Sequence, residues 1–234
     1  MEKTTDTSDR SDAIRVLLIR HGQSEANLQH RFAGQCNPDL TPLGRAQAEA
    51  TAAYLADEPM AAIWSSDLLR AFHTATPHEA YHAVHVETSE ALREFCAGDW
   101  EGKTQTELST RYPGLYPDRW SREFGTFCPP GGEPIVHLAE RVYDEIRRIC
   151  ELYPGKTVCI VSHAGAIRAF WGKISGFSPE DVGCRVNFPT NASVSTCLYR
   201  NGVFFPLSYS EDSHLRELGT PLQTVFFGED KSQK

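Results

Sequence analysis

Short apolar runs, rich in β-branched residues, recur along the chain between stretches of mixed polarity. The clearest runs cover residues 14–20 and 157–162, and shorter ones cover residues 61–65 and 84–87. A continuous apolar run of this length, bounded by polar residues, is typical of a strand in the interior of a parallel sheet. The pattern therefore predicts four strands, and it predicts that the first and the last of them are buried.

An amphipathic stretch begins at Thr41. This residue is a suitable N-cap, and Pro42 fits the first helical position, where its missing N–H is not needed. Small and apolar side chains then recur at helical spacing, at Leu43, Ala46, Ala50 and Ala53. We expect a helix that carries these residues on one face.

Further helices are expected on both sides of the last strand and after the second strand. Asp67 is suited to cap a helix that includes Arg70 and Thr74. Residues 134–153 form the longest amphipathic pattern, and another helical stretch begins at Ala164. The apolar face of the longest pattern comprises Leu138, Val142, Ile146 and Ile149.

A hairpin is expected near the end of the chain, because residues 194–199 and 203–208 flank the turn dipeptide Asn201-Gly202. The alternation of strands and helices before it predicts an α/β fold: a three-layer domain with helices on both faces of a mostly parallel central sheet. The hairpin gives this sheet a mixed edge. Such sheets bind ligands beyond the carboxyl ends of their strands, where His21 and His163 lie.

The chain of 234 residues has the length of one α/β domain. Residues 1–12 and 228–234 are polar and aperiodic, and we expect them to be disordered tails. Residues 13–227 contain no repeat of solenoid length and no low-complexity segment. We therefore expect them to form a single domain.

The composition is that of a globular protein, with 40% hydrophobic and 23% charged residues and a formal net charge of −8. It excludes collagen, coiled coil and disorder of the whole chain. A negative net charge argues against broad binding to nucleic acid or to an anionic membrane surface. We expect neither as a partner, although a small positive pocket is compatible with this balance.

No apolar run reaches the length of a bilayer span, and the polar N-terminus is unlike a signal peptide. The seven cysteines are odd in number and include no C-x-x-C pair, which fits a reducing compartment. These features predict a cytoplasmic protein.

The most distinctive chemistry follows the first strand, in the segment Arg20-His21-Gly22. Glycine lets the backbone turn tightly beside the imidazole, and arginine presents a fork of donors that suits phosphate oxygens. The tripeptide alone is weak evidence. Three other segments strengthen it: residues 65–71, which include Arg70, residues 92–95, which include Glu94, and residues 161–165, which include His163 and Ala164.

These segments together resemble the histidine phosphatase superfamily, the phosphoglycerate-mutase-like enzymes, and they occur in that family's order. The resemblance extends from about residue 14 to residue 215. It implies that His21 is the nucleophile that becomes phosphorylated and that Glu94 is the proton donor. It also implies phosphate-binding roles for Arg20, Asn27, Arg70, His163 and Ala164.

The same residue types suit phosphoryl transfer on chemical grounds. A neutral imidazole is a competent nucleophile, and a covalent intermediate divides hydrolysis into two easier steps. Two arginines and a protonated His163 can neutralise the charge of the phosphoryl oxygens. Glu94 can protonate the leaving group, provided that its pKa is raised. We therefore expect no metal site and no organic cofactor.

Two positions favour a phosphatase over a phosphoglycerate mutase, which is the main alternative. In mutases of this family an arginine typically follows the acidic glutamate, whereas this chain has Phe95. Ala33 stands where the mutases commonly have a small hydroxyl residue. The expected partner is a small phosphorylated metabolite, and the sequence leaves its identity and the oligomeric state of the protein open.

Residues 103–133 are expected to form a substrate-specificity insert. They lie between Glu94 and the longest helix and are rich in arginine and aromatic residues. Such side chains can cover a substrate and bind a second anionic or sugar group. The candidate specificity residues are Phe95, Arg111, Arg119, Trp120 and Arg122.

Two alternatives from other classes remain. Residues 78–82, HEAYH, match the H-E-x-x-H pattern of zinc hydrolases, although Pro77 and the strand that follows leave little room for the required helix. The other alternative is a catalytically silent domain that binds a phosphorylated ligand. Such a domain would need neither the nucleophile His21 nor the proton donor Glu94.

Overall fold

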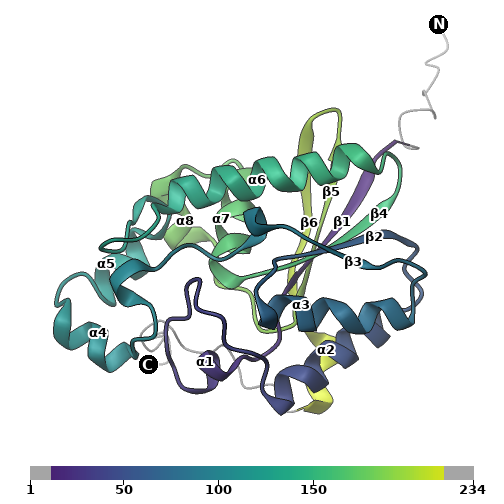
Figure 1. Cartoon of the computed structure of the whole chain (residues 1–234). Helices are drawn as coiled ribbons and strands as arrows, with labels where there is room; N and C mark the ends of the chain where they lie inside the picture. Colours follow the sequence, from purple (N-terminus) through teal and green to yellow (C-terminus); the bar gives the residue numbers. More distant parts are fainter. Residues whose placement is uncertain (1–11, 219–234) are drawn as a thin grey trace, which may run out of the picture.

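The computed structural model describes residues 12–218, so the expected tails lie outside the described residues apart from Asp12. A six-stranded sheet runs through the molecule, with helices on both sides (Figure 1). The strands are β1 (Ile14–Arg20), β2 (Met60–Ser65), β3 (Val86–Thr88), β4 (Thr157–Ser162), β5 (Val194–Arg200) and β6 (Val203–Glu211). The helices are α1 (Glu25–Leu28), α2 (Pro42–Tyr54), α3 (Leu69–Ala75), α4 (Gln105–Arg111), α5 (Asp118–Arg122), α6 (Ile135–Leu152), α7 (Ala164–Ile174) and α8 (Pro179–Arg185).

The strands lie in the order β3-β2-β4-β1-β5-β6. The first four are parallel to one another, whereas β5 pairs antiparallel with β1, and β6 pairs antiparallel with β5. β1 and β4 are neighbours, and their register places Arg20 opposite Ser162. The mostly parallel sheet with a mixed edge is therefore confirmed, and the residues that follow β1 and β4 emerge side by side.

Both faces of the sheet are covered, which confirms the three layers. Val16 and Leu18 belong to a core that includes residues of α6 and α7. Leu17 and Ile19 point the other way, into a second core that includes residues of α3. Figure 1 shows α6 and α7 above the sheet and α2 and α3 below it. Burial on both faces explains why β1 and β4 are continuous apolar runs rather than alternating ones.

Helix α2 begins where expected but buries another face. Thr41 is its N-cap, and the Thr41 hydroxyl accepts a hydrogen bond from the Gly44 N–H at 3.0 Å. Leu43, Ala46, Ala50 and Ala53 all lie in this helix, as expected, but their side chains are half-buried or exposed. The buried residues are Gly44, Gln47, Ala48, Thr51 and Ala52. This face packs against α3, the 3-10 segments Thr76–Ala80 and Ser213–Leu218, and the loop after β1. Gln47 accepts a hydrogen bond from the N–H of Gln23 in that loop.

Asp67 does not cap α3, contrary to expectation. Its carboxylate binds Arg93, whose Nε donates to Oδ1 at 2.7 Å, and Leu68 is the N-cap without a side-chain hydrogen bond. The N–H of Leu69 donates instead to Oδ1 of Asn37 at 2.7 Å. Asn37, which is distant in sequence, therefore binds the first N–H of the helix, and Arg93 binds the carboxylate that was expected to do so.

The longest helix and the hairpin agree with the prediction. Asn201 and Gly202 join β5 to β6, and both have positive φ, as a tight turn between antiparallel strands requires. β3 starts two residues later than expected, at Val86. The apolar face of α6 is buried throughout, at Leu138, Val142, Ile146 and Ile149.

Residues 103–133 contain α4 and α5, which lie at one end of the molecule, beyond the carboxyl ends of the parallel strands (Figure 1). Their assignment as a specificity insert stays a prediction. Among the helices of residues 12–218, none is long and apolar enough to cross a membrane.

Candidate active site

His21 and His163 follow the neighbouring strands β1 and β4. The N–H of His21 donates to the carbonyl of Ser162 at 3.0 Å, which extends the contact between the strands by one residue. Both imidazoles are buried, and their ring centroids lie 5.2 Å apart. The strand ends therefore bring together the two histidines that the sequence analysis selected.

The imidazole of His21 is held in one tautomer. Its Nδ1 lies 2.7 Å from the carbonyl oxygen of Gly22. Because a carbonyl oxygen only accepts, Nδ1 carries the proton and Nε2 keeps its lone pair. Burial, together with the charges of Arg70 and Arg20, holds the pKa of His21 well below its usual range. The ring is therefore neutral, and its Nε2 has the properties of a nucleophile.

The loop after β1 is fixed by two helices. The N–H of Gly22 donates to Oγ1 of Thr74 in α3 at 3.0 Å, and the N–H of Gln23 donates to Oε1 of Gln47 in α2 at 2.8 Å. A Cβ atom at Gly44 would overlap the carbonyl oxygen of Gln23, and one at Gly22 would overlap Gly44. The two glycines therefore allow the loop and α2 to meet backbone against backbone.

Two buried arginines line the same cavity as His21. Arg20 and Arg70 are only 4% and 1% exposed. Arg20 donates to the carbonyl of Pro189 at 2.6 Å, and Arg70 donates to the carbonyls of Gly34 and Cys36, each at 2.8 Å. In the described part of the chain neither forms an ion pair, and the Nε of each has no hydrogen-bond partner. Burial lowers the pKa of each to about 10, so both stay charged at neutral pH without a counter-ion.

His163 is buried beside these charges. Its Nε2 lies 2.8 Å from the hydroxyl of Ser66, and its Nδ1 has no hydrogen-bond partner among the described residues. Burial, with the charge of Arg70, holds the pKa of His163 well below its usual range. The surroundings thus favour a neutral His163 and not the protonated form expected from the sequence. A neutral imidazole can still donate one hydrogen bond to a phosphoryl oxygen.

Asn27 turns its amide nitrogen toward the cavity. Its Oδ1 accepts hydrogen bonds from the Ser24 N–H at 3.1 Å and from Nδ2 of Asn191 at 3.2 Å. Because the oxygen faces two donors, the Nδ2 group is the end that remains for a ligand in the cavity that Asn27 lines. Asn191 also donates to the carbonyl of His21 at 3.0 Å and so connects both residues.

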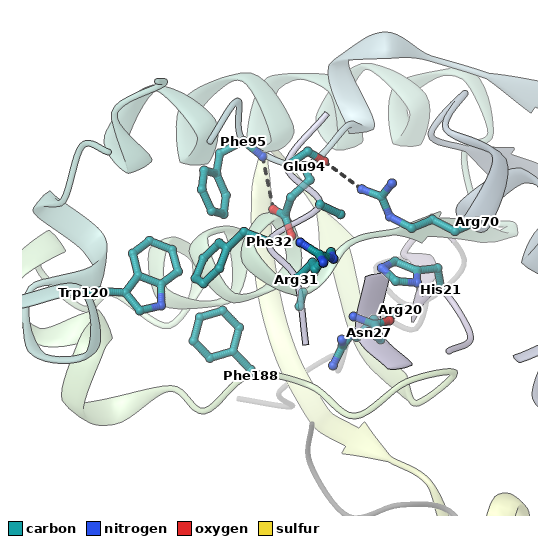
Figure 2. A pocket seen from close by; sticks show the side chains of 13 residues that line it. Arg20, His21, Asn27, Arg31, Phe32, Arg70, Glu94, Phe95, Trp120 and Phe188 are labelled. Carbon is teal, nitrogen blue, oxygen red and sulfur yellow. Dashed lines mark hydrogen bonds between the residues drawn. The ribbon is translucent and has the colours of Figure 1, made fainter. Parts of the chain in front are cut away.

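The carboxylate of Glu94 lies at the N-terminus of α7. It accepts hydrogen bonds from the N–H groups of Gly165 at 2.9 Å and Ala166 at 3.0 Å. It also accepts one from the N–H of Phe95 at 3.2 Å, which Figure 2 shows as a dashed line. Burial raises the pKa of Glu94 and outweighs the opposing effects of the Gly165 hydrogen bond and the charge of Arg70. A raised pKa is what a carboxyl group needs to donate a proton near neutral pH.

Arg141 of α6 holds the backbone of Glu94, and the sequence analysis missed it. Its guanidinium donates to the carbonyls of Glu94 at 2.9 Å, Arg93 at 2.8 Å and Ala91 at 3.0 Å. The same group binds both carboxylate oxygens of Glu133, at 2.8 and 2.9 Å. Arg141 lies on the polar side of a strongly amphipathic helix, where a charged residue carries no signal of its own.

The cavity has two unlike sides (Figure 2). The nitrogen-bearing side chains on one side are those of Arg20, His21, Asn27 and Arg70. The aromatic rings on the other side are those of Phe32, Phe95, Trp120 and Phe188. The rest of the lining comprises Arg31, Ala33, Gly34, Glu94 and Ala164. The sequence analysis selected Phe95 and Trp120 but missed Phe32, Phe188 and Arg31, which stand in irregular segments without periodicity.

The arginines of the expected insert point elsewhere. Arg111, Arg119 and Arg122 are all exposed, and Arg119 pairs with Glu123 at 2.8 Å. None of the three lines the cavity, whereas Trp120 does. Adjacent side chains on a short helix such as α5 point in different directions, so that the tryptophan faces inward and the arginines face outward.

Residues 78–82 do not form the helix of a zinc hydrolase. They lie in a 3-10 segment, Thr76–Ala80, and in the turn that follows it. The rings of His78 and His82 stack with centroids 6.3 Å apart, and Glu79 accepts a hydrogen bond from the N–H of Val86 at 2.7 Å. Across residues 12–218, no group of three or more His, Cys, Asp or Glu side chains is placed to hold a metal ion.

The sequence and the structure of this chain are both similar to those of known proteins. Residues 16–212 match the description of a protein family, the histidine phosphatase superfamily (branch 1). The native structure of a mycobacterial glucosyl-3-phosphoglycerate phosphatase superposes with a TM-score of 0.79 and 28% sequence identity. The match covers 86% of this chain and 100% of that one.

Curated relatives include both phosphatases and a mutase. A bifunctional protein of Mycobacterium tuberculosis is 39% identical over 163 residues, which are 69% of this chain and 44% of that protein, so the chain spans less than half of that relative's length. A metal-independent phosphoserine phosphatase of Arabidopsis thaliana is 31% identical over 229 residues, 97% of this chain and 93% of that protein. A 2,3-bisphosphoglycerate-dependent phosphoglycerate mutase of Cytophaga hutchinsonii is 33% identical over 181 residues, which are 76% of this chain and 84% of that protein.

Proposed function

The chain belongs to the histidine phosphatase superfamily, and from this premise we propose that it hydrolyses a small phosphomonoester through a phosphohistidine at His21. One observation carries the proposal. Two buried guanidinium groups, of Arg20 and Arg70, have no carboxylate partner in the described chain and line one cavity with a neutral imidazole. Uncompensated buried cations beside a nucleophile suit a dianionic phosphoryl group.

In the first step, the lone pair of His21 Nε2 attacks phosphorus and the bond from phosphorus to the ester oxygen breaks. The hydrogen bond from Nδ1 to the carbonyl of Gly22 supports the positive charge that the ring acquires. Arg20, Arg70, Asn27 and the neutral His163 donate to the phosphoryl oxygens, and the N–H of Ala164, the first residue of α7, adds a backbone donor in the cavity lining.

Glu94 acts twice in this scheme. Its carboxyl group first gives a proton to the departing alkoxide, for which its raised pKa prepares it. Its carboxylate then takes a proton from the attacking water while the bond between phosphorus and Nε2 breaks. Phosphate leaves, and both His21 and Glu94 return to their starting protonation states.

A phosphatase fits the cavity better than a mutase does. A mutase must bind a second anionic group beside the acid, but the residue after Glu94 is Phe95, whose ring is part of an apolar wall. The arginines Arg111, Arg119 and Arg122 are exposed outside the cavity and offer no second anion site there. Efficient isomerisation of 3-phosphoglycerate in the presence of 2,3-bisphosphoglycerate would overturn this choice.

We also propose a small metabolite in the cytoplasm as the substrate, in place of a nucleic acid. The net charge of −8 disfavours polyanions. The seven cysteines are all free, as is usual in a reducing compartment.

The test is phosphate release from p-nitrophenyl phosphate by the wild type and by His21→Ala. We expect the variant to lose at least about a thousandfold in kcat. His137→Ala, which removes an exposed histidine of α6, is the matched control and is expected to retain full activity. Rapid quenching should also trap an alkali-stable, acid-labile phosphoryl group in the wild type. Equal rates for His21→Ala and the wild type would show that the nucleophile is another residue.

A further inference from the structure

Three polar side chains stand in a row at the carboxyl ends of neighbouring strands. Ser66 follows β2, His163 follows β4 and His21 follows β1, and these strands are adjacent in the order β2-β4-β1. The proposed mechanism uses both imidazoles but gives no role to the Ser66 hydroxyl. This hydroxyl lies 2.8 Å from Nε2 of His163, and both side chains are buried. The hydrogen bond between them therefore decides which nitrogen of His163 is left for a ligand.

The backbone holds Ser66 in place against β4. Its N–H donates to the carbonyl of Val161 at 2.9 Å, one residue beyond the position where Ser65 pairs with Val161 in the sheet. The carbonyl of Ser65 in turn accepts a hydrogen bond from the N–H of Ser89 at 2.9 Å. Ser66 is 0% exposed, so its hydroxyl has to find its hydrogen-bond partners within the protein.

The Ser66 hydroxyl accepts one hydrogen bond and has one proton to donate. Its Oγ accepts from the N–H of Leu68 at 3.3 Å. Among residues 12–218, Nε2 of His163 is the one acceptor placed to receive the hydroxyl proton. A neutral imidazole has a single protonated nitrogen. If Nε2 accepts from Ser66, the ring proton is therefore on Nδ1.

The opposite tautomer would leave more polar groups unpaired. With the proton on Nε2, that nitrogen would donate to Oγ, and the hydroxyl proton of Ser66 would have no acceptor in the described chain. The lone pair of His163 Nδ1 would be unpaired as well. With the proton on Nδ1, the Nδ1–H is the single unpaired group. Because each buried polar group without a partner destabilises the fold, the Nδ1–H form is favoured.

The remaining Nδ1–H suits a phosphoryl group. The ring of His163 lies 5.2 Å from that of His21, between centroids, and so stands beside the proposed nucleophile. A phosphoryl oxygen would supply the acceptor that Nδ1 lacks among the described residues. The opposite tautomer would turn a lone pair toward an anionic oxygen, and the two would repel each other.

We infer that Ser66 is a positioning residue, which holds His163 in the Nδ1–H tautomer so that the ring donates to the phosphoryl group. The inference rests on the proposed phosphatase for the use of this donor, whereas the tautomer is a property of the free protein. The two histidines are thereby set for complementary roles. His21 donates from Nδ1 to the carbonyl of Gly22 and keeps a lone pair that reacts, while His163 accepts at Nε2 and keeps a proton that it donates.

The first test observes the tautomer directly. Protein that contains isotopically labelled histidine is examined without ligand at neutral pH by long-range proton–nitrogen correlation NMR, which separates protonated from unprotonated ring nitrogens. The signals of His163 are those that disappear in His163→Gln. We expect a protonated Nδ1 and an unprotonated Nε2. A protonated Nε2, alone or together with a protonated Nδ1, would overturn the inference.

A pair of serine variants then tests the role of the hydroxyl. Ser66→Ala removes the donor, so the Nε2–H form of His163 should appear in the spectrum. Its kcat/KM for p-nitrophenyl phosphate should fall about threefold to tenfold, because loss of one hydrogen bond lowers the population of the competent tautomer. Ser65→Ala is the matched control. It removes the adjacent buried hydroxyl, which donates to the carbonyl of Ser66 at 2.8 Å, and it should change neither the tautomer nor the rate.

The outcomes distinguish this inference from the proposed function. A lower kcat/KM in Ser66→Ala with an unchanged tautomer would overturn the inference, because the serine would then act on folding alone. A changed tautomer with an unchanged rate would also overturn it and would leave the phosphatase intact. If Ser66→Ala fails to fold, the wild-type spectrum still decides. Absence of phosphate release by the wild type would refute the proposed function, and with it the use of the donor, whatever the tautomer.

Discussion

The Nδ1 atom of His21 lies 2.7 Å from the carbonyl oxygen of Gly22, the next residue in the chain. The donor and the acceptor are adjacent in sequence, so the tautomer of the ring is set locally, by the turn that follows β1. The reactive Nε2 is thereby defined before any substrate binds.

Activity should persist in mildly acidic solution. An ordinary histidine nucleophile becomes protonated below a pH of about 6.5 and stops working. The pKa of His21 is well below that value because of burial and the charges of Arg70 and Arg20, so the ring stays neutral there. A profile of kcat against pH, measured at saturating substrate, should therefore show no decline near pH 6.5 on its acidic side. A decline centred there would contradict the assigned state of the ring.

Activity should fall as the solution becomes alkaline, because the proposed mechanism needs a protonated Glu94 in its first step. The pKa of Glu94 is raised by burial, and above that pKa the group is a carboxylate that cannot donate. Glu94→Gln should lower kcat for glycerol 3-phosphate about a hundredfold or more. It should also abolish the alkaline limb of the pH profile, which is the decline in activity at high pH. With p-nitrophenyl phosphate, whose leaving group needs little protonation, the loss should be smaller. Equal losses for both esters would argue against a role as acid.

Inorganic phosphate should stabilise the folded protein. Arg20 and Arg70 are buried without a counter-ion in the described chain, so a bound anion relieves an uncompensated charge. When the concentration of free phosphate is about 100 times its Kd, the free energy of unfolding of the wild type should rise by about 2.7 kcal/mol. This corresponds to a rise of roughly 5 °C or more in Tm, which scanning fluorimetry measures. Arg70→Gln should lose most of this gain, whereas Arg185→Gln, on the surface of α8, should keep it. An unchanged gain in Arg70→Gln would place phosphate elsewhere.

Arg141 should act as a positioning residue for Glu94. It holds the Glu94 carbonyl at 2.9 Å, and its charge lowers the pKa of the carboxyl group. Arg141→Gln should reduce kcat about tenfold and move the alkaline limb of the profile to higher pH, because the lowering charge is gone. Arg147→Gln, an exposed residue of the same helix, should change neither quantity. A fall in kcat with an unmoved limb would indicate a structural role only.

His78 should make the fold sensitive to acid. It is fully buried, and burial lowers its pKa to about 4 from an ordinary value of 6.5. Between these values the unfolded chain binds a proton that the folded chain does not, so stability declines as pH falls from about 6.5 toward 4. We expect the free energy of unfolding, measured with urea, to fall between pH 7 and pH 5 by about 2 kcal/mol less in His78→Leu than in the wild type. An equal loss in both proteins would contradict this origin.

The parts of the fold that the sequence predicts well are those in which the buried positions are apolar. β1 and β4 are apolar on both faces, and α6 has one clear apolar stripe, so the pattern and the environment agree. α2 differs because its buried face contacts backbone polar groups of two loops: Gln47 accepts a hydrogen bond from the N–H of Gln23 after β1, and Thr51 contacts the carbonyl of Ala192 before β5. Periodicity of apolar residues cannot indicate a face that is buried for its hydrogen bonds.

The residues of the candidate site also differ in how well the sequence predicts them. His21, Arg70 and His163 stand at the ends of regular elements or within them, where the sequence fixes their direction. Phe32 and Phe188 lie in irregular segments, which lack the periodicity that predicts the direction of a side chain. The composition of residues 103–133 suggested contact with substrate, but it did not distinguish Trp120, which faces the cavity, from the arginines beside it.

The two sides of the cavity have separate structural origins. The nitrogen-bearing side chains stand at the end of β1, directly after it, or in α1 and α3, so they are fixed by the sheet and its covering helices. The rings come from α5 and from connecting segments at one end of the molecule. We therefore expect substitutions among the rings to leave the backbone that carries the nitrogen-bearing side chains in place, so that the two sides of one cavity tolerate change independently.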